Sequence, residues 1–181
     1  MQIKKLANDV INFAIRRVIE IVAISIAIAG FLLFLSLTSF SPDDPNFIFP
    51  ENTEIKNFLG FQGAFIADLF FQSFGLIALL IPFGLFITGI NIFFNKKIFL
   101  IIESFFYTIV YSLLGSLFFS KFYSTAFKLY INGNGGFVGK YLKKSFLNSM
   151  IDINANFFYY FLILIILIFF LISIQFKINS F

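Results

Sequence analysis

The sequence contains no histidine, no cysteine and no tryptophan, and only 12% of its 181 residues are charged. Without His and Cys, the chain has no Ser-His-Asp or Cys-His nucleophile, no His- or Cys-ligated metal and no disulfide. The apolar fraction is 60%, against roughly 45–50% in soluble domains. One core of this size cannot bury that much apolar surface, so we expect an integral membrane protein that holds no cofactor.

Four stretches of the chain are apolar and almost free of charge. We predict membrane-spanning helices at about residues 18–40, 69–94, 98–120 and 153–176, joined by outer loops at about 41–68 and 121–152. At about 1.5 Å per residue, each stretch is long enough to cross the ~30 Å hydrocarbon layer. Pro82 lies inside the second stretch, where we expect it to kink the helix.

The first seventeen residues carry apolar side chains three and four positions apart, with charges between them. This spacing predicts a cytoplasmic amphipathic helix over residues 1–17 that lies on the membrane surface. A cleaved signal peptide is the alternative for the segment after it, because Ala27-Ile28-Ala29 resembles a cleavage site. The apolar run continues to Phe40, well past that site, as it does in a membrane anchor.

The distribution of Lys and Arg predicts that both termini are cytoplasmic. Four cations precede the first span, whereas Lys56 alone lies in the loop over 41–68, and the first helix usually sets the orientation. The totals are closer, with seven cations inside and six outside, because the 121–152 loop holds Lys121, Lys128, Lys140, Lys143 and Lys144. No basic stripe with interleaved aromatics forms, so we expect no direct binding of nucleic acid.

An internal repeat appears when the chain is shifted by 76 residues against itself. The shift aligns Gly60 and Gly63 with Gly136 and Gly139, and Ser73 with Ser149. We therefore predict an all-α membrane protein built from two parallel two-helix repeats, each with an outer loop and a Gly-x-x-Gly element at the membrane interface. Chance similarity in a Phe-rich sequence is the alternative.

Four acidic residues are candidates for chemistry. Glu103 lies inside the third span near Lys96 and Lys97, so it suits an interfacial or intersubunit contact, or an ion or proton path. The adjacent Asp43 and Asp44 stand between two prolines, a setting for turns and helix caps and not for a catalytic pair. Asp68 is expected on an interfacial turn, where its carboxylate stays hydrated.

A glycine-rich stretch, Gly133 to Lys140, resembles a phosphate-binding loop. The pattern fails because Asn134 replaces a required Gly, and Tyr141 replaces the Ser or Thr after the Lys. A turn followed by an amphipathic helix is the better interpretation.

Small residues indicate where helices pack closely. They occur in the first three spans, at Ala23, Ala27, Gly30, Gly75, Ala78, Ser112, Gly115 and Ser116. The stretch from Phe157 to Ile172 has none, so we expect the fourth helix to face lipid.

A set of scarce residues occurs in a fixed order: Ser41, Pro42, Asp43, Asp44 and Pro45 at the end of the first span, then Gly60, Gly63 and Asp68, then Pro82. This set resembles the N-terminal four-helix membrane domain of the FtsK/SpoIIIE family of bacterial DNA translocases. The resemblance is sharp over about residues 33–90 and rests on hydropathy elsewhere.

The resemblance implies a membrane anchor and assembly domain of a septal protein that couples chromosome segregation to cell division. Its partners would be membrane lipid, division-site membrane proteins and further copies in a hexamer, in the inner membrane at the septum. The chain contains no Walker motif, so we expect no enzyme activity from these residues. A small four-span transporter or channel that uses Glu103 is the alternative function.

Overall fold

The computed structural model describes residues 2–45, 54–124 and 132–175, and none of these residues forms a strand. Four helical stretches are long and apolar enough to cross a membrane: Asn8–Thr38, Gly60–Asn95, Leu100–Phe122 and Ala155–Ser173. The predicted all-α architecture is therefore confirmed. Lys128, parts of both predicted outer loops (46–53 and 125–131) and Phe176 of the fourth predicted span lie outside the described residues.

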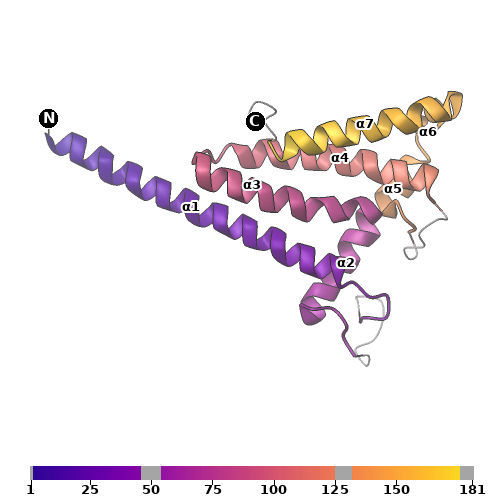
Figure 1. Cartoon of the computed structure of the whole chain (residues 1–181), viewed down its shortest axis with the longest axis horizontal. Helices are drawn as coiled ribbons and strands as arrows, with labels where there is room; N and C mark the ends of the chain where they lie inside the picture. Colours follow the sequence, from indigo (N-terminus) through magenta and orange to yellow (C-terminus); the bar gives the residue numbers. More distant parts are fainter. Residues whose placement is uncertain (1, 46–53, 125–131, 176–181) are drawn as a thin grey trace.

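The first span belongs to helix α1, Gln2–Thr38, which contains 37 residues. No break separates the predicted surface segment, 1–17, from the span. A helix of this length extends about 55 Å, well beyond the ~30 Å hydrocarbon layer. Figure 1 shows its N-terminal part projecting past the turn between α3 and α4.

The second predicted span consists of three helical pieces. Helix α2 covers Gly60–Phe74, the 3₁₀ helix η1 covers Gly75–Leu80, and α3 covers Ile81–Asn95. The expected kink at Pro82 is wrong, because Pro82 lies in the first turn of α3, where its missing N–H costs no helical hydrogen bond. The chain bends at Gly75 instead, with φ 70° and ψ −147°, a conformation that glycine adopts readily.

The second half of the chain has a similar order of elements. Helix α4 covers Leu100–Phe122, α5 covers Gly136–Leu142, α6 covers Phe146–Ile153 and α7 covers Ala155–Ser173. Asn154 caps α7 by accepting a hydrogen bond from the Phe157 N–H at 3.1 Å. Helix α1 packs on α3, α4 packs on α7, and α3 contacts α4, so the bundle consists of two antiparallel pairs.

The predicted repeat appears in the backbone. Gly60 and Gly136 both have positive φ, 65° and 64°, and each begins a helix. Each N–H donates to the carbonyl three residues earlier, Asn57 at 2.9 Å and Gly133 at 3.0 Å. Equivalent positions therefore adopt the same local conformation, which favours a true repeat over chance similarity.

The bundle has two distinct ends. The loop end holds the Ser41–Pro45 segment together with α2, α5 and α6, and the turn end holds the α3–α4 turn (Figure 1). Helix α7 also ends there, since the Ile174 carbonyl accepts a hydrogen bond from Asn91 at 2.9 Å. Both described chain ends are therefore nearer the turn end.

Small residues form the closest helix contacts, as predicted for the first span. A Cβ added to Gly89 would lie 2.6 Å from the Ala27 nitrogen, and one added to Gly30 would lie 2.6 Å from the Phe86 nitrogen. Helices α1 and α3 therefore touch backbone to backbone. Among the described residues of α7, only Leu162, Ile166 and Ser173 are buried, which agrees with a lipid-facing fourth helix.

Candidate interaction surface at the loop end

The Ser41–Pro45 segment is fastened to the chain that follows the first loop. An oxygen of the Asp44 carboxylate accepts a hydrogen bond from the Lys56 N–H at 2.7 Å, while the Lys56 amine pairs with Asp43 at 2.8 Å. Asp44 is 3% exposed, whereas the Asp43 side chain is 70% exposed. The two aspartates therefore have different roles, one holding the loop and the other forming a surface ion pair, and the expected turn is confirmed.

The surface ion pair is solvated and intact at neutral pH. The carboxylate of Asp43 raises the pKa of the Lys56 amine above its ordinary value through a hydrogen bond and charge attraction. Lys56 therefore keeps its proton at neutral pH.

Asn57 connects the end of α1 to the start of α2. Its amide group donates to the Ser36 carbonyl at 2.8 Å, and its side-chain oxygen accepts from the Leu59 N–H at 3.1 Å. The Ser36 hydroxyl donates in turn to the Gly63 carbonyl at 2.7 Å. A Cβ on Gly63 would lie 2.6 Å from the Leu59 side chain, so Gly63 is needed for this close approach.

The two repeats meet where the bend after α2 touches the start of α5, and we call this contact the repeat junction: Ser73, Gly75, Asn134 and Gly136. The Leu76 N–H donates to the Asn134 carbonyl at 2.9 Å. A Cβ on Gly136 would lie 2.5 Å from the Ser73 carbonyl oxygen and 2.6 Å from the Gly75 nitrogen. The glycine-rich stretch that fails as a phosphate loop therefore packs against the bend at Gly75.

Asp68 does not lie on a turn, and that prediction is wrong. It is in the middle of α2 and half-buried, and its Oδ1 atom is buried with no hydrogen-bond partner among the described residues. The glycine pair that precedes it begins a helix, so the turn ends at Gly60.

Glu103 lies in the first turn of α4 and is partly exposed. A carboxylate there is favoured by the N-terminal end of the helix dipole. No ion pair to Glu103 is found within the described ranges 2–45, 54–124 and 132–175, and an interfacial or intersubunit contact stays a prediction. The Glu103 side chain therefore lies at the end of the bundle and not in its interior.

Glu20, which sequence reasoning missed, forms the ion pair at the α3–α4 turn. Its carboxylate pairs with the Lys96 amine at 2.7 Å and with the Arg17 guanidinium at 2.6 Å. The contact ties α1 to the end of α3. The sequence could have indicated this pair, because Glu20 is a single acidic residue at the edge of the first span and the Lys96-Lys97 turn lies at the same end of the bundle.

A line of hydroxyl side chains runs along α4. Its members are four residues apart: Ser104, Thr108, Ser112, Ser116 and Ser120. Sequence reasoning identified only two of them, Ser112 and Ser116, as residues at close helix contacts. Ser104 exchanges a 2.6 Å hydrogen bond with Thr88 of α3, and Ser116 donates to the Phe74 carbonyl at 2.9 Å. Hydroxyl groups thus join α4 to its neighbours where lipid offers no partner.

Part of the lysine-rich second loop is structural. The Lys121 amine pairs with Asp152 at 2.5 Å and donates to the Asn148 side chain at 2.8 Å, joining α4 to α6. Lys140, Lys143 and Lys144 are exposed at the loop end. No group of three or more His, Cys, Asp or Glu side chains that could hold a metal occurs in the described part of the chain.

Comparisons with known proteins agree on one family. A model of the 4TM region of DNA translocase FtsK/SpoIIIE matches residues 15–180. The DNA translocase FtsK of Rickettsia prowazekii (strain Madrid E) is 31% identical over 77 residues, which are 42% of this chain and 10% of that relative. The DNA translocase FtsK of Rickettsia typhi (strain ATCC VR-144 / Wilmington) is 36% identical over 64 residues, 35% of this chain and 9% of that relative.

The matched segments therefore span about a tenth of these relatives. No solved structure matches the chain. The family model covers nearly all of the sequence, including the four spans and both glycine elements. The chain is thus a multi-pass inner-membrane protein, and it belongs to the family of the 4TM region of the DNA translocases FtsK and SpoIIIE.

Proposed function

We propose that this domain anchors a cytoplasmic ATP-driven DNA motor in the inner membrane at the division septum. In this role it contacts division-site membrane proteins through its loop end, and several copies assemble, as a hexamer, to match the motor. The observation that carries the proposal is the match to the FtsK/SpoIIIE membrane region over residues 15–180. The fastened Ser41–Pro45 segment supports it, because the loop end then presents a defined surface at low entropic cost.

The loop end offers exposed aromatic surface beside that segment. The Phe58 side chain is 76% exposed, while its backbone N–H donates to the Ser39 hydroxyl at 3.1 Å. An aromatic ring on a held backbone is a typical contact residue in protein interfaces. Phe99 in the α3–α4 turn, 68% exposed, is a matched residue at the opposite end.

We expect a fluorescent fusion of this chain to concentrate at the constriction site in dividing cells. Phe58→Ser should lower that enrichment by about tenfold, because the aromatic contact with the partner is lost. Phe99→Ser, at the turn end, should leave it unchanged, and both variants should insert normally. Uniform fluorescence of the unmodified fusion, or an equal loss in both variants, would contradict the proposal.

The proposed orientation places the turn end in the cytoplasm and the loop end outside. Because the chain has no cysteine, a single introduced thiol reports its own location. Glu54→Cys, exposed in the first loop, should react with a membrane-impermeant maleimide in intact cells. Lys97→Cys, exposed in the α3–α4 turn, should react only after permeabilisation. The reverse pattern would show that the domain is inverted.

A further inference from the structure

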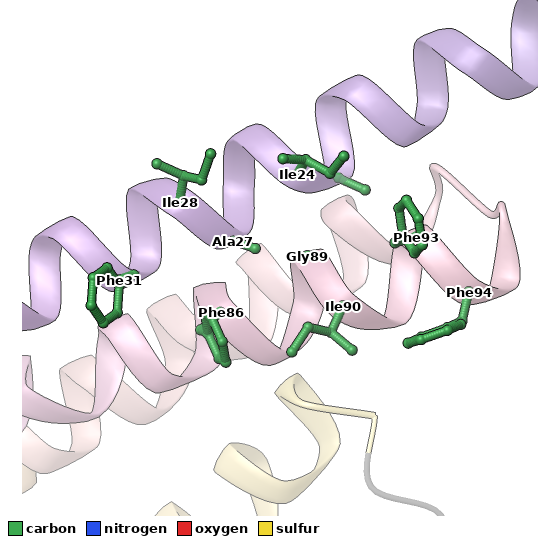
Figure 2. Close-up of a pocket in the computed structure, with 10 residues that line it drawn as sticks. Ile24, Ala27, Ile28, Phe31, Phe86, Gly89, Ile90, Phe93 and Phe94 are labelled. Atoms are coloured by element: carbon green, nitrogen blue, oxygen red, sulfur yellow. The ribbon is translucent and has the colours of Figure 1, made fainter.

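An apolar groove runs between α1 and α3, and all of its lining residues come from these two helices. It encloses about 520 Å³. Ala27 and Gly89 form its floor, where the two helices touch, and larger side chains form its walls (Figure 2). The lining residues are all apolar: Ala23, Ile24, Ala27, Ile28, Phe31, Phe86, Gly89, Ile90, Phe93 and Phe94.

The groove leads to a charged group at the turn end. The Lys96 amine lies 4.1 Å from the centre of the Phe93 ring, which lines the groove, and pairs with Glu20. Glu20 also holds Arg17. Two cations and one carboxylate leave one net positive charge, and the neighbouring Arg16 and Lys97 are exposed.

We propose that this groove binds one anionic phospholipid, with an acyl chain between α1 and α3 and the phosphate at Lys96 and Arg17. A phospholipid joins an apolar acyl chain to a headgroup that contains an anion. The apolar groove is complementary to the acyl chain, and its cationic end is complementary to the anion. Basic pockets between membrane helices at the cytoplasmic side bind such headgroups. Glu20 positions the two cations and leaves their remaining N–H donors for the phosphate.

A helix from a second copy fits the groove less well. The most exposed helix, α7, carries no charged residue between Ala155 and Ser173, so it would leave the cations at the turn end without a counter-charge. Acyl chains also gain no net burial on entering, since lipid tails are as apolar as the walls. Selectivity for an anionic lipid therefore comes from the net negative charge of its headgroup, at about fivefold for each cation engaged, and decreases with added salt.

The absence of tryptophan allows a direct test by fluorescence quenching. Phe31→Trp places a reporter in the groove wall, and Leu164→Trp places one on the exposed face of α7. Residue 31 lies eleven residues from Glu20, and residue 164 lies ten residues from Ile174. At about 1.5 Å per residue, both reporters are therefore at a similar depth, about 15 Å from the turn end. Each full chain is reconstituted in phosphatidylcholine vesicles that contain increasing fractions of brominated phosphatidylglycerol.

We expect half-maximal quenching at Phe31→Trp at a several-fold lower fraction of brominated phosphatidylglycerol than at Leu164→Trp. Lys96→Gln should remove the difference, and so should Arg17→Gln, which keeps the Lys96–Glu20 pair. Lys143→Gln at the loop end is the matched control and should leave the difference between the two reporters unchanged. Coincident curves would overturn the proposal. Weaker quenching at Phe31→Trp than at Leu164→Trp, relieved when the protein is diluted in lipid, would identify a second copy as the occupant of the groove and would also overturn the proposal.

Discussion

Gly136→Ala is expected to destabilise the repeat junction by about 3–5 kcal/mol. The residue has φ 64°, which costs alanine about 1–2 kcal/mol. The added Cβ would also lie 2.5 Å from the Ser73 carbonyl and 2.6 Å from the Gly75 nitrogen. Both neighbours are backbone atoms, so the two repeats must move apart, which adds about 2–3 kcal/mol.

The equivalent residue of the first repeat is a matched control. Gly60 has φ 65°, but a Cβ added there meets nothing within 4 Å. Gly60→Ala should therefore cost only the backbone strain of about 1–2 kcal/mol. The comparison is made by titrating the protein in mixed micelles with a denaturing detergent and following helix content by circular dichroism. Equal losses of stability in Gly136→Ala and Gly60→Ala would show that the repeat junction contributes nothing to the stability of the domain.

Gly89→Ala should separate α1 from α3 and cost about 2–4 kcal/mol. Its Cβ would lie 2.6 Å from the Ala27 nitrogen and 2.7 Å from the Ala23 oxygen. In lipid, helices associate through close packing because burial itself supplies little driving force. A methyl group at this crossing therefore removes the contact over several turns.

Gly84→Ala on the same helix is the control for Gly89→Ala. Its Cβ would lie 3.5 Å from the Tyr111 hydroxyl, an ordinary van der Waals distance. Glycine inside a helix costs about 0.5–1 kcal/mol relative to alanine, so Gly84→Ala should be neutral or stabilising by up to that amount. The same unfolding titration measures both variants, and a loss at Gly84 as large as that at Gly89 would exclude a specific role for the α1–α3 crossing.

Much of the fold could be predicted because membrane helices are recognised by length and hydropathy alone. The repeat was also visible, since Gly60 and Gly136 need a backbone conformation that other residues resist. Asp43 and Asp44 were correctly assigned to a turn from the two prolines around them. In each case the evidence is local, and local interactions decide the outcome.

The features that sequence reasoning missed or placed wrongly depend on how the helices pack together. The ion pair of Lys96 with Glu20, 76 residues earlier, was not predicted. Pro82 was expected to kink a helix, but the bend is at Gly75, against the Asn134 loop. Asp68 was expected on a turn, but lies within α2. Hydropathy does not specify how each helix is rotated, and rotation decides which side chains meet.

The sequence by itself determined that lipid is the solvent, that four helices cross it and that two halves repeat one pattern. These properties follow from residue composition and from the conformations that glycine and proline allow. Only the tertiary structure decided that the bend at Gly75 packs against Asn134 and Gly136, that Glu20 holds Arg17 and Lys96, and that α1 and α3 enclose an apolar groove. Such contacts depend on the rotation and depth of each helix, which the bundle sets as a whole.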